Sequence, residues 1–186
     1  MEHDLRPPTL CIRSATPADV AALFRLKQAL TKAEGNEAVL RATEADWLRD
    51  GFGPQPRFMS LVAESSGTIV GMLIYSEFYL TALADVVLSI QDLFVEPAHR
   101  RSGAGRALLA ALAAHALERR IPLIQLNVQE DNPARQFYRR AGFQHLRGCL
   151  TYAVGGGPMQ DLAAGRDDGS CGGRARNVKQ PLTSGR

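Results

Sequence analysis

The sequence has little of what secreted or membrane-spanning proteins need. Three cysteines, Cys11, Cys149 and Cys171, lie far apart among 186 residues, and their odd number and wide spacing fit free thiols in a reducing compartment. No apolar run approaches the roughly 20 residues that span a bilayer. Residues 1–8 also have no apolar core of the kind found in a secretory signal peptide. We therefore expect a soluble, cytoplasmic protein without a membrane partner.

Metal ligands and a uniformly basic surface are missing as well. The cysteines have no metal-ligand spacing and the four histidines are scattered, so no metal site is expected. The formal net charge is +3, from 22 Lys and Arg against 19 Asp and Glu. Much of the basic excess lies in a short loop near residue 100 and in a tail that begins at Gly165. This distribution does not predict a nucleic-acid-binding face.

A chain of this length can bury one good core, which predicts a single domain. We expect a flexible N-terminus over residues 1–8, the domain over residues 9–154, and a disordered Gly/Arg-rich tail over residues 155–186, with a helical turn or two at 159–164. The element order β-α-α-β-β-β-α-β-α-β-β indicates an α/β protein, a mixed sheet of about seven strands with helices on both faces. The expected strands are 9–13, 58–64, 68–80, 85–97, 121–128, 143–147 and 149–154, and the expected helices are 17–32, 43–48, 107–117 and 133–142.

The segment 85–117 is typical of an anion-binding site. An apolar strand leads through a basic loop with two glycines into an Ala/Leu-rich helix. The N–H groups at the start of a helix have no partner within it, and the helix dipole favours negative charge there. Gly103 and Gly105 allow a phosphate to approach the main chain, and Arg100, Arg101 and Arg106 add positive charge. We predict that this loop holds a pyrophosphate.

The residues of this loop carry a family resemblance. Residues 100–105 match the Arg/Gln-x-x-Gly-x-Gly/Ala signature of the GNAT (Gcn5-related) N-acetyltransferases, in the expected place after the fourth strand. Residues 132–133 and 137–143 are similar to that family's second conserved segment, and residues 12–19 resemble its opening strand and helix start. The resemblance covers residues 10–154. It implies the GNAT acyl-CoA N-acyltransferase fold, acetyl-CoA as co-substrate, and a homodimer.

Within the family, the chain most resembles the diamine (spermidine/spermine) and thialysine acetyltransferases. The matching segments are residues 32–34, 48–53 and 91–95, together with 137–140. Two positions depart from the pattern. Gln91-Asp92 stands where the subfamily usually has paired acids, and Ala33 replaces an aromatic residue. Both departures weaken the case for a long polyamine and shift the expectation towards a short or zwitterionic primary amine.

The resemblance implies a role for each part of the site. Tyr138 would act as the general acid that protonates the departing thiolate, and Glu34, Gln91 and Asp92 would contact the amine. The pantetheine arm would pair with the main chain of Leu93, Phe94 and Val95 like an added strand. The residues expected to hold the pyrophosphate or to border the co-substrate are Arg100, Arg101, Ser102, Gly103, Ala104, Gly105, Arg106, Asp131, Asn132, Pro133 and Ala134.

Amine acetylation requires a group that accepts the proton of the amine and a donor that stabilises the oxyanion. An alkylammonium with a pKa near 10 must lose a proton before it attacks, which at neutral pH costs roughly 4 kcal/mol. Glu34 and Asp92 are the carboxylates that could hold the cation and relay this proton. A backbone N–H of the fourth strand can stabilise the oxyanion. No metal and no nucleophilic side chain are required.

Two other functions stay open on the sequence alone. An acyl-CoA-binding sensor or interaction module would bind CoA without turnover, and Tyr138 would then be a core residue. A basic tail beyond residue 154 could contact nucleic acid, which would give salt-sensitive binding. The expectation that we carry forward is an acetyl-CoA-dependent N-acetyltransferase that acts on a small primary amine by direct attack in a ternary complex.

Overall fold

The computed structural model describes residues 10–146 and 152–165, which fall in two compact units, residues 1–144 and 145–186. The first unit contains a five-stranded sheet whose spatial order follows the sequence. Its first four strands pair antiparallel, and the fifth pairs parallel to the fourth. The strands are β1 (Leu10–Ser14), β2 (Met59–Ser65), β3 (Thr68–Leu80), β4 (Asp85–Val95) and β5 (Ile124–Leu126).

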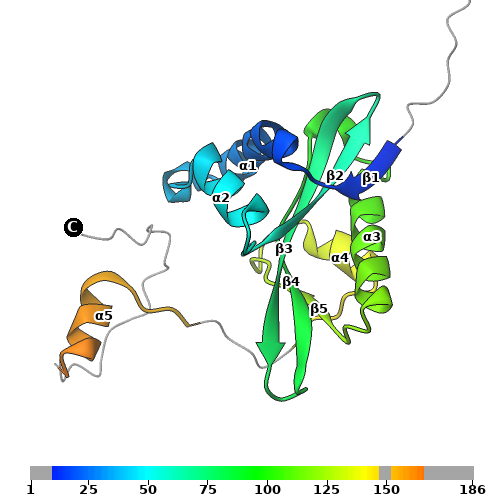
Figure 1. The fold of residues 1–186 in the computed structure, drawn as a ribbon. Helices are drawn as coiled ribbons and strands as arrows, with labels where there is room; N and C mark the ends of the chain where they lie inside the picture. The colour runs from blue at the N-terminus through cyan, green and yellow to red at the C-terminus, as the bar shows by residue number, and fades with distance from the viewer. Residues whose placement is uncertain (1–9, 147–151, 166–186) are drawn as a thin grey trace, which may run out of the picture. The chain divides into compact units, whose positions relative to one another are not determined.

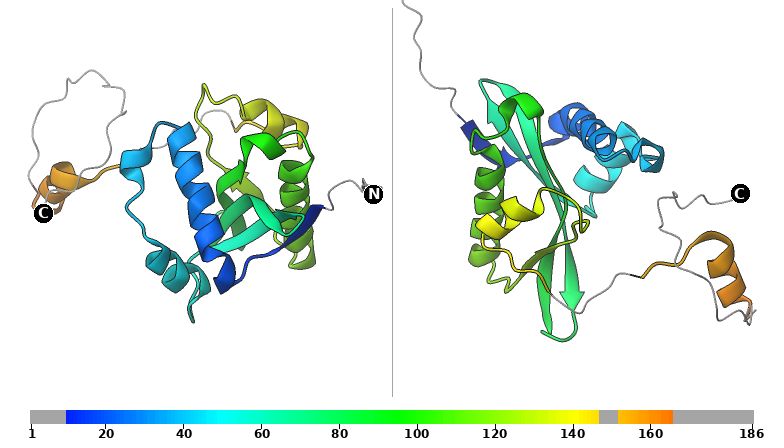
Figure 2. Two further views of the ribbon diagram at one scale, coloured as in Figure 1. Left: turned by 90° about the horizontal axis from the view of Figure 1, so that it is seen from above. Right: turned by 180° about the vertical axis from the view of Figure 1, so that it is seen from behind.

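Helices cover both faces of the sheet, as the sequence predicts (Figure 1). Two of them lie on one face and two on the other, which the turned views also show (Figure 2). The first face carries α1 (Val20–Ala33) and α2 (Glu44–Phe52), and the second carries α3 (Ala104–Glu118) and α4 (Arg135–Arg140).

The side-chain alternation of the strands produces two separate cores. On β2 and β3, Leu61 and Leu73 join a cluster with Leu108 of α3. Their neighbours Val62 and Met72 point to the other face and join a cluster with α1 and α2. The central strands are therefore apolar on both faces, which explains why they read as continuous hydrophobic runs.

Asp19 anchors the start of α1 to the first strand. It ends a 3-10 turn, Pro17–Asp19, and is buried. Its carboxylate accepts hydrogen bonds from Arg13 at 2.7 and 3.0 Å and from the N–H and hydroxyl of Thr16 at 2.7 and 2.9 Å. The guanidinium of Arg13, which also bonds to Glu64 on β2, and the bonds from Thr16 hold the pKa of Asp19 well below its usual range, although burial opposes this.

We expect Asp19→Ala to lower the free energy of unfolding at pH 7 by about 2–3 kcal/mol, the range of hydrogen bonds to a charged group. Because folding depresses the pKa of Asp19, its stabilisation is fully present above the unfolded carboxyl's pKa of about 4 and is lost as the pH falls below it. Urea unfolding at pH 7 and at about pH 2 should therefore show a larger difference between variant and wild type at pH 7. Glu118→Ala, at an exposed position, is the control. An equal difference at both pH values would contradict this assignment.

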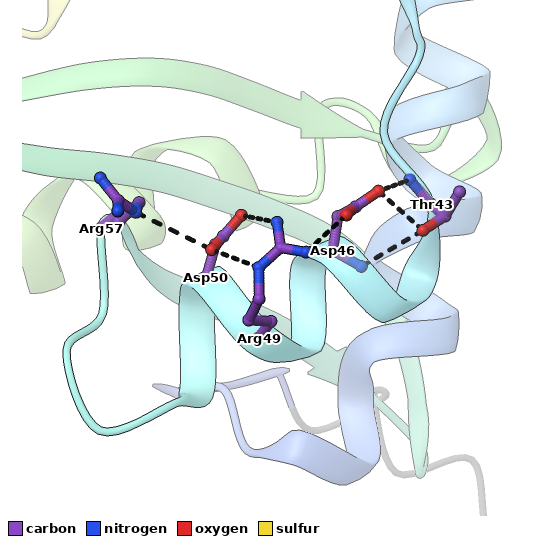
Figure 3. Close-up of polar contacts among 5 residues, drawn as sticks. All are labelled: Thr43, Asp46, Arg49, Asp50 and Arg57. Carbon is purple, nitrogen blue, oxygen red and sulfur yellow. Dashed lines mark hydrogen bonds and ion pairs between the residues drawn. The ribbon is translucent and has the colours of Figure 1, made fainter.

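A polar network on α2 fixes the segment that follows α1 (Figure 3). Thr43 caps the helix: its hydroxyl accepts from the N–H of Asp46 at 3.2 Å, and the Asp46 carboxylate accepts from the N–H and hydroxyl of Thr43. Arg49 then bridges Asp46 and Asp50, and Arg57 lies 3.8 Å from Asp50. These contacts are a reciprocal capping box extended by ion pairs. On the inner side of α2, Trp47 packs edge-on against two phenylalanines of the core.

Two expected strands are absent from the described residues, so the structure has five strands rather than about seven. Residues 143–146 and 152–154 carry no strand, while 147–151 lie outside the described residues. The apolar side chains that suggested strands here, Leu146, Tyr152 and Val154, are exposed and face no core. The main chain after α4 instead closes that helix, since the N–H of Phe143 donates to the C=O of Tyr138.

The expected strand 121–128 is also shorter than predicted. The N–H of Ile121 bonds to Ala116 and closes the end of α3, the C=O of Leu123 then accepts from Leu88 of β4, and the paired strand runs from Ile124. The second unit contains α5 (Gly156–Ala163), which overlaps the helical turns expected at 159–164 and starts earlier. The rest of the expected tail, residues 166–186, lies outside the described residues, and the domain boundary after residue 154 stays a prediction. Within the described ranges, no helix is both long and apolar enough to cross a bilayer.

Candidate active site

A β-bulge in the middle of β4 organises the candidate site. The register with β3 shifts between the pairs Tyr75↔Ile90 and Ile74↔Asp92, so Gln91 is the extra residue. One extra residue reverses the alternation of the strand beyond it. Before the bulge, Ile90 packs on the α3 face; after it, Leu93 does so instead. Asp92 consequently faces α1.

The same bulge turns main-chain groups of β4 towards an open edge. The N–H of Leu88 donates to Leu123 on the β5 side, whereas the N–H of Glu96 donates to Val70 of β3. Because hydrogen-bonding direction alternates along a strand, the main-chain groups of Leu93 and Val95 point away from β3. Phe94, between them, directs its main-chain groups at β3.

No strand in the described part of the chain pairs with that edge, although the C=O of Val95 accepts a side-chain hydrogen bond from Arg100. β5 pairs with Leu88, Ser89 and Ile90 of β4 and with no later residue. The residues 91–95 therefore have a strand neighbour on the β3 side alone. An unpaired row of N–H and C=O groups is a template for an extended ligand with its own amide groups.

The loop after β4 opens next to this edge. A 3-10 turn, Pro97–His99, leads to Arg100, whose Nε donates to the C=O of Val95 at 3.1 Å and whose guanidinium lies over the Phe94 ring, 5.7 Å from its centroid. Arg100 is thus held against β4. Arg101, Ser102 and Arg106 are exposed, as an anion site at the protein surface requires.

Two glycines shape the start of α3. Gly103 is its N-cap and has φ 91°, a left-handed conformation that other residues adopt only with strain. Gly105 lies in the first turn, where an added Cβ would come within 3.4 Å of Phe137 and 3.8 Å of Val95. The helix start, α4 and the end of β4 are packed together at this point. In the first turn of this 15-residue helix, the N–H of Ala104 donates to the Ser102 hydroxyl at 3.4 Å, whereas those of Gly105 and Arg106 precede the first intrahelical bond and can meet an anion.

Three charged side chains gather on the α1 side of the bulge. The Nζ of Lys27 lies 2.7 Å from Oδ1 of Asp92, and both side chains are largely buried. Glu34, the C-cap of α1, is exposed, yet desolvation by its neighbours and the charge of Asp92 raise its pKa, with Lys27 opposing the shift. Gln91 points elsewhere: its side-chain amide donates to the hydroxyl of Ser76 at 3.0 Å.

Tyr138 comes to the same place from α4. Its ring is packed edge-on between Phe137 and Phe143, with centroids 5.3 and 5.8 Å away. Burial raises the pKa of Tyr138, and the carboxylates of Glu34 and Asp92 raise it further. The hydroxyl therefore remains protonated at neutral pH and can donate a hydrogen bond or a proton.

Residues 131–134 form the turn that starts α4. The side-chain Oδ1 of Asn132 accepts from the N–H of Ala134 at 2.8 Å, as expected of a cap, although regular helix begins two residues beyond Pro133. Asp131 and Pro133 are exposed. The described residues contain no group of three or more His, Cys, Asp or Glu side chains that could hold a metal ion.

The structure brings most residues expected from the sequence to one region, and it adds one that the sequence analysis missed. Asp92, Glu34 and Tyr138 interact electrostatically across three elements, while Gln91 is tied to β3. The missed residue is Lys27. The sequence does single out Lys27, because it is the one charged side chain on the otherwise apolar stripe of α1. Its partner Asp92 lies 65 residues away, so no local pattern could predict the pair.

Sequence comparisons identify the family to which this chain is similar. The family model described as acetyltransferase (GNAT) family matches residues 21–143. Thialysine N-epsilon-acetyltransferase from Mus musculus is 30% identical over 164 residues, which cover 82% of this chain and 96% of the relative.

Solved structures show the same fold. An integron cassette protein from the mobile metagenome of V. cholerae superposes with a TM-score of 0.70 at 21% identity, covering 83% of this chain and 97% of the other. An aminoglycoside acetyltransferase from an uncultured soil metagenomic sample, in complex with sisomicin, gives 0.65 at 18% identity, covering 78% and 96%.

Proposed function

The chain belongs to the acetyltransferase (GNAT) family, and we propose that it transfers the acetyl group of acetyl-CoA to a primary amine of a small molecule, a diamine or polyamine or a thialysine-like amino acid. One observation carries the proposal. The strand-free edge of β4 begins at the bulge that carries Asp92, whose charge, with that of Glu34, raises the pKa of Tyr138, and it ends beside the glycine-bearing start of α3. This juxtaposition suits a co-substrate with amide groups at one end and phosphates at the other.

Residues of the edge and the loop fit acetyl-CoA. The main-chain groups of Leu93 and Val95 would pair with the amides of its pantetheine arm. The pyrophosphate would bind the first-turn N–H groups between Gly103 and Arg106, with Arg101 alongside. When bound, acetyl-CoA supplies an activated acyl group, and residues 131–134 would border it at the start of α4.

Glu34 is suited to take the proton that the acceptor must lose. An ammonium with a pKa near 10 is almost fully protonated at pH 7, and its deprotonation costs roughly 4 kcal/mol. A carboxylate with a raised pKa both attracts the cation and accepts the proton more readily than an ordinary glutamate does. Glu34 would act directly or through one water.

Tyr138 is suited to protonate the leaving thiolate. In direct attack, the amine nitrogen bonds to the thioester carbonyl carbon, the C–S bond breaks, and the sulfur receives a proton. Complete transfer from a tyrosine, whose usual pKa is about 10, to a thiolate of pKa about 8.5 is uphill. Tyr138 would therefore first donate a hydrogen bond to the sulfur. Its proton would pass to the sulfur only as the attacking nitrogen loses its second proton, which restores the tyrosine hydroxyl.

Initial-rate kinetics test the proposed order of events. Direct attack requires acetyl-CoA and amine to be bound together, so double-reciprocal plots should intersect when both concentrations are varied. Parallel lines would mean that an acetyl-enzyme forms first and would contradict direct attack. The assay is release of the CoA thiol.

The loop arginines should act on co-substrate binding alone. We expect Arg101→Ala and Arg106→Ala each to raise the KM for acetyl-CoA about tenfold and to leave kcat within about twofold, since each removes a charge-assisted contact made equally in ground and transition states. The effect should shrink at high salt. Arg57→Ala, on the exposed loop after α2, is the matched control. An unchanged KM in both loop variants would place the pyrophosphate elsewhere.

A further inference from the structure

Lys27 and Glu34 share one face of α1. Seven residues correspond to almost two full turns of an α-helix, so the two side chains project in nearly the same direction. The rest of that stripe is apolar, with Val20 and Leu23 buried against the sheet. A lysine in this setting needs a partner, because a buried ammonium is costly unless it is paired.

The partner is the carboxylate that would otherwise be free for a substrate. Lys27 lies 2.7 Å from Asp92, and the exposed fractions of the two side chains are 21% and 14%. The bulge at Gln91 aims Asp92 at α1 and therefore creates the pair. Glu34, in contrast, has no ion-pair partner among the residues that the structure describes.

The charge balance of the acceptor side follows from these contacts. Glu34 and Asp92 contribute two negative charges and Lys27 one positive charge, which leaves an excess of one carboxylate. An incoming ammonium can form an ion pair with that carboxylate, Glu34. A second ammonium on the same acceptor would meet Asp92 already paired and would be repelled by Lys27, whereas a carboxylate on the acceptor would be attracted.

We propose that Lys27 determines the charge class of the acceptor: it neutralises Asp92 from within the chain, leaves Glu34 as the single free anionic contact, and so selects a monoamine or a zwitterionic, thialysine-like amino acid over a diamine or polyamine. The inference rests on the proposed function of the site. Lys27 takes no part in proton transfer, and it acts as a specificity determinant through Asp92.

Butylamine and putrescine provide a direct test, because they have the same carbon chain and differ by one ammonium. Thialysine adds a zwitterionic acceptor to this comparison, and spermidine adds a longer polycation. The quantity measured is the ratio of kcat/KM for the monocation or zwitterion to that for the polycation, in wild type and in Lys27→Met. We expect Lys27→Met to shift this ratio towards the polycation by at least about tenfold, chiefly through the KM of the polycation.

Three further variants separate charge from structure. Lys27→Arg keeps the charge and should leave the ratio within about twofold. Lys27→Gln, a second neutral variant, should reproduce the shift if Lys27→Met folds poorly. Lys32→Met removes an exposed lysine from the same helix and should leave the ratio unchanged.

The outcomes distinguish this inference from the proposed function. If the wild type releases thiol with these amines but prefers spermidine, Lys27 does not determine specificity. The same holds if neither neutral variant changes the ratio. In both cases the proposed acetyltransferase function is unaffected. If the wild type releases no thiol with any amine, the proposed function fails and the inference fails with it.

Discussion

Replacing Tyr138 with phenylalanine is expected to lower kcat for acetyl transfer by about 100- to 10,000-fold, the usual contribution of a positioned general acid. The change removes the hydroxyl alone. Phenylalanine keeps the ring between Phe137 and Phe143, so the free energy of unfolding should change little. The KM values for both substrates should also stay close to those of the wild type, because the hydroxyl acts in the transition state.

Tyr79→Phe is the matched control for this variant, since Tyr79 is exposed near the end of β3. It should keep full activity. A Tyr138→Phe variant that retains kcat within about threefold would show that the thiolate leaves without this residue, and water would then be the proton source.

The second large effect is expected at Glu34. We predict that Glu34→Gln lowers kcat/KM for the amine by about 100-fold, since glutamine neither accepts the proton nor balances the charge of the ammonium. Because the pKa of Glu34 is raised, the base is protonated and inactive at pH values where an ordinary glutamate, with a pKa of about 4.3, is still charged. In a plot of kcat/KM against pH, the decline on the acid side should therefore occur at a higher pH than an ordinary glutamate would give. This decline should be absent in Glu34→Gln.

Glu37→Gln, three residues further along the chain at an exposed position, controls for general charge effects near α1. Its pH profile should match that of the wild type. A Glu34→Gln profile that keeps the acid limb would transfer the role of base to another group, of which Asp92 is the nearest candidate on β4.

Much of the fold was visible in the sequence because its signals are local. The helix start at Thr16-Pro17, the β2–β3 turn and the glycine-bearing loop before α3 each depend on residues a few positions apart. The mixed sheet with helices on both faces follows from the order of these elements and is confirmed. The last two expected strands were wrong for the residues described, since Leu146, Tyr152 and Val154 are exposed and the N–H of Phe143 closes α4.

The decisive features of the site depend on long-range contacts. β4 has continuous apolar runs, Val86–Leu88 and Leu93–Val95, on either side of its polar middle, so neither run shows which residues face α1 and the position of the bulge could not be predicted. The bulge nevertheless determines that the side chain of Asp92 faces α1 and that the main-chain groups of Leu93 and Val95 point to the open edge. The Lys27–Asp92 pair likewise joins residues 65 apart, and only the folded sheet shows that the expected substrate contact is already neutralised from within the chain.

Amine-dependent release of the CoA thiol is the measurement that tests the central claim most directly. Wild-type protein incubated with acetyl-CoA and a panel of monoamines, thialysine, diamines and aminoglycosides should release thiol with at least one of them, the amine product should carry the acetyl group, and Tyr138→Phe should abolish most of the rate. Tight CoA binding without thiol release for any amine would contradict the account and would identify the protein as an acyl-CoA-binding module.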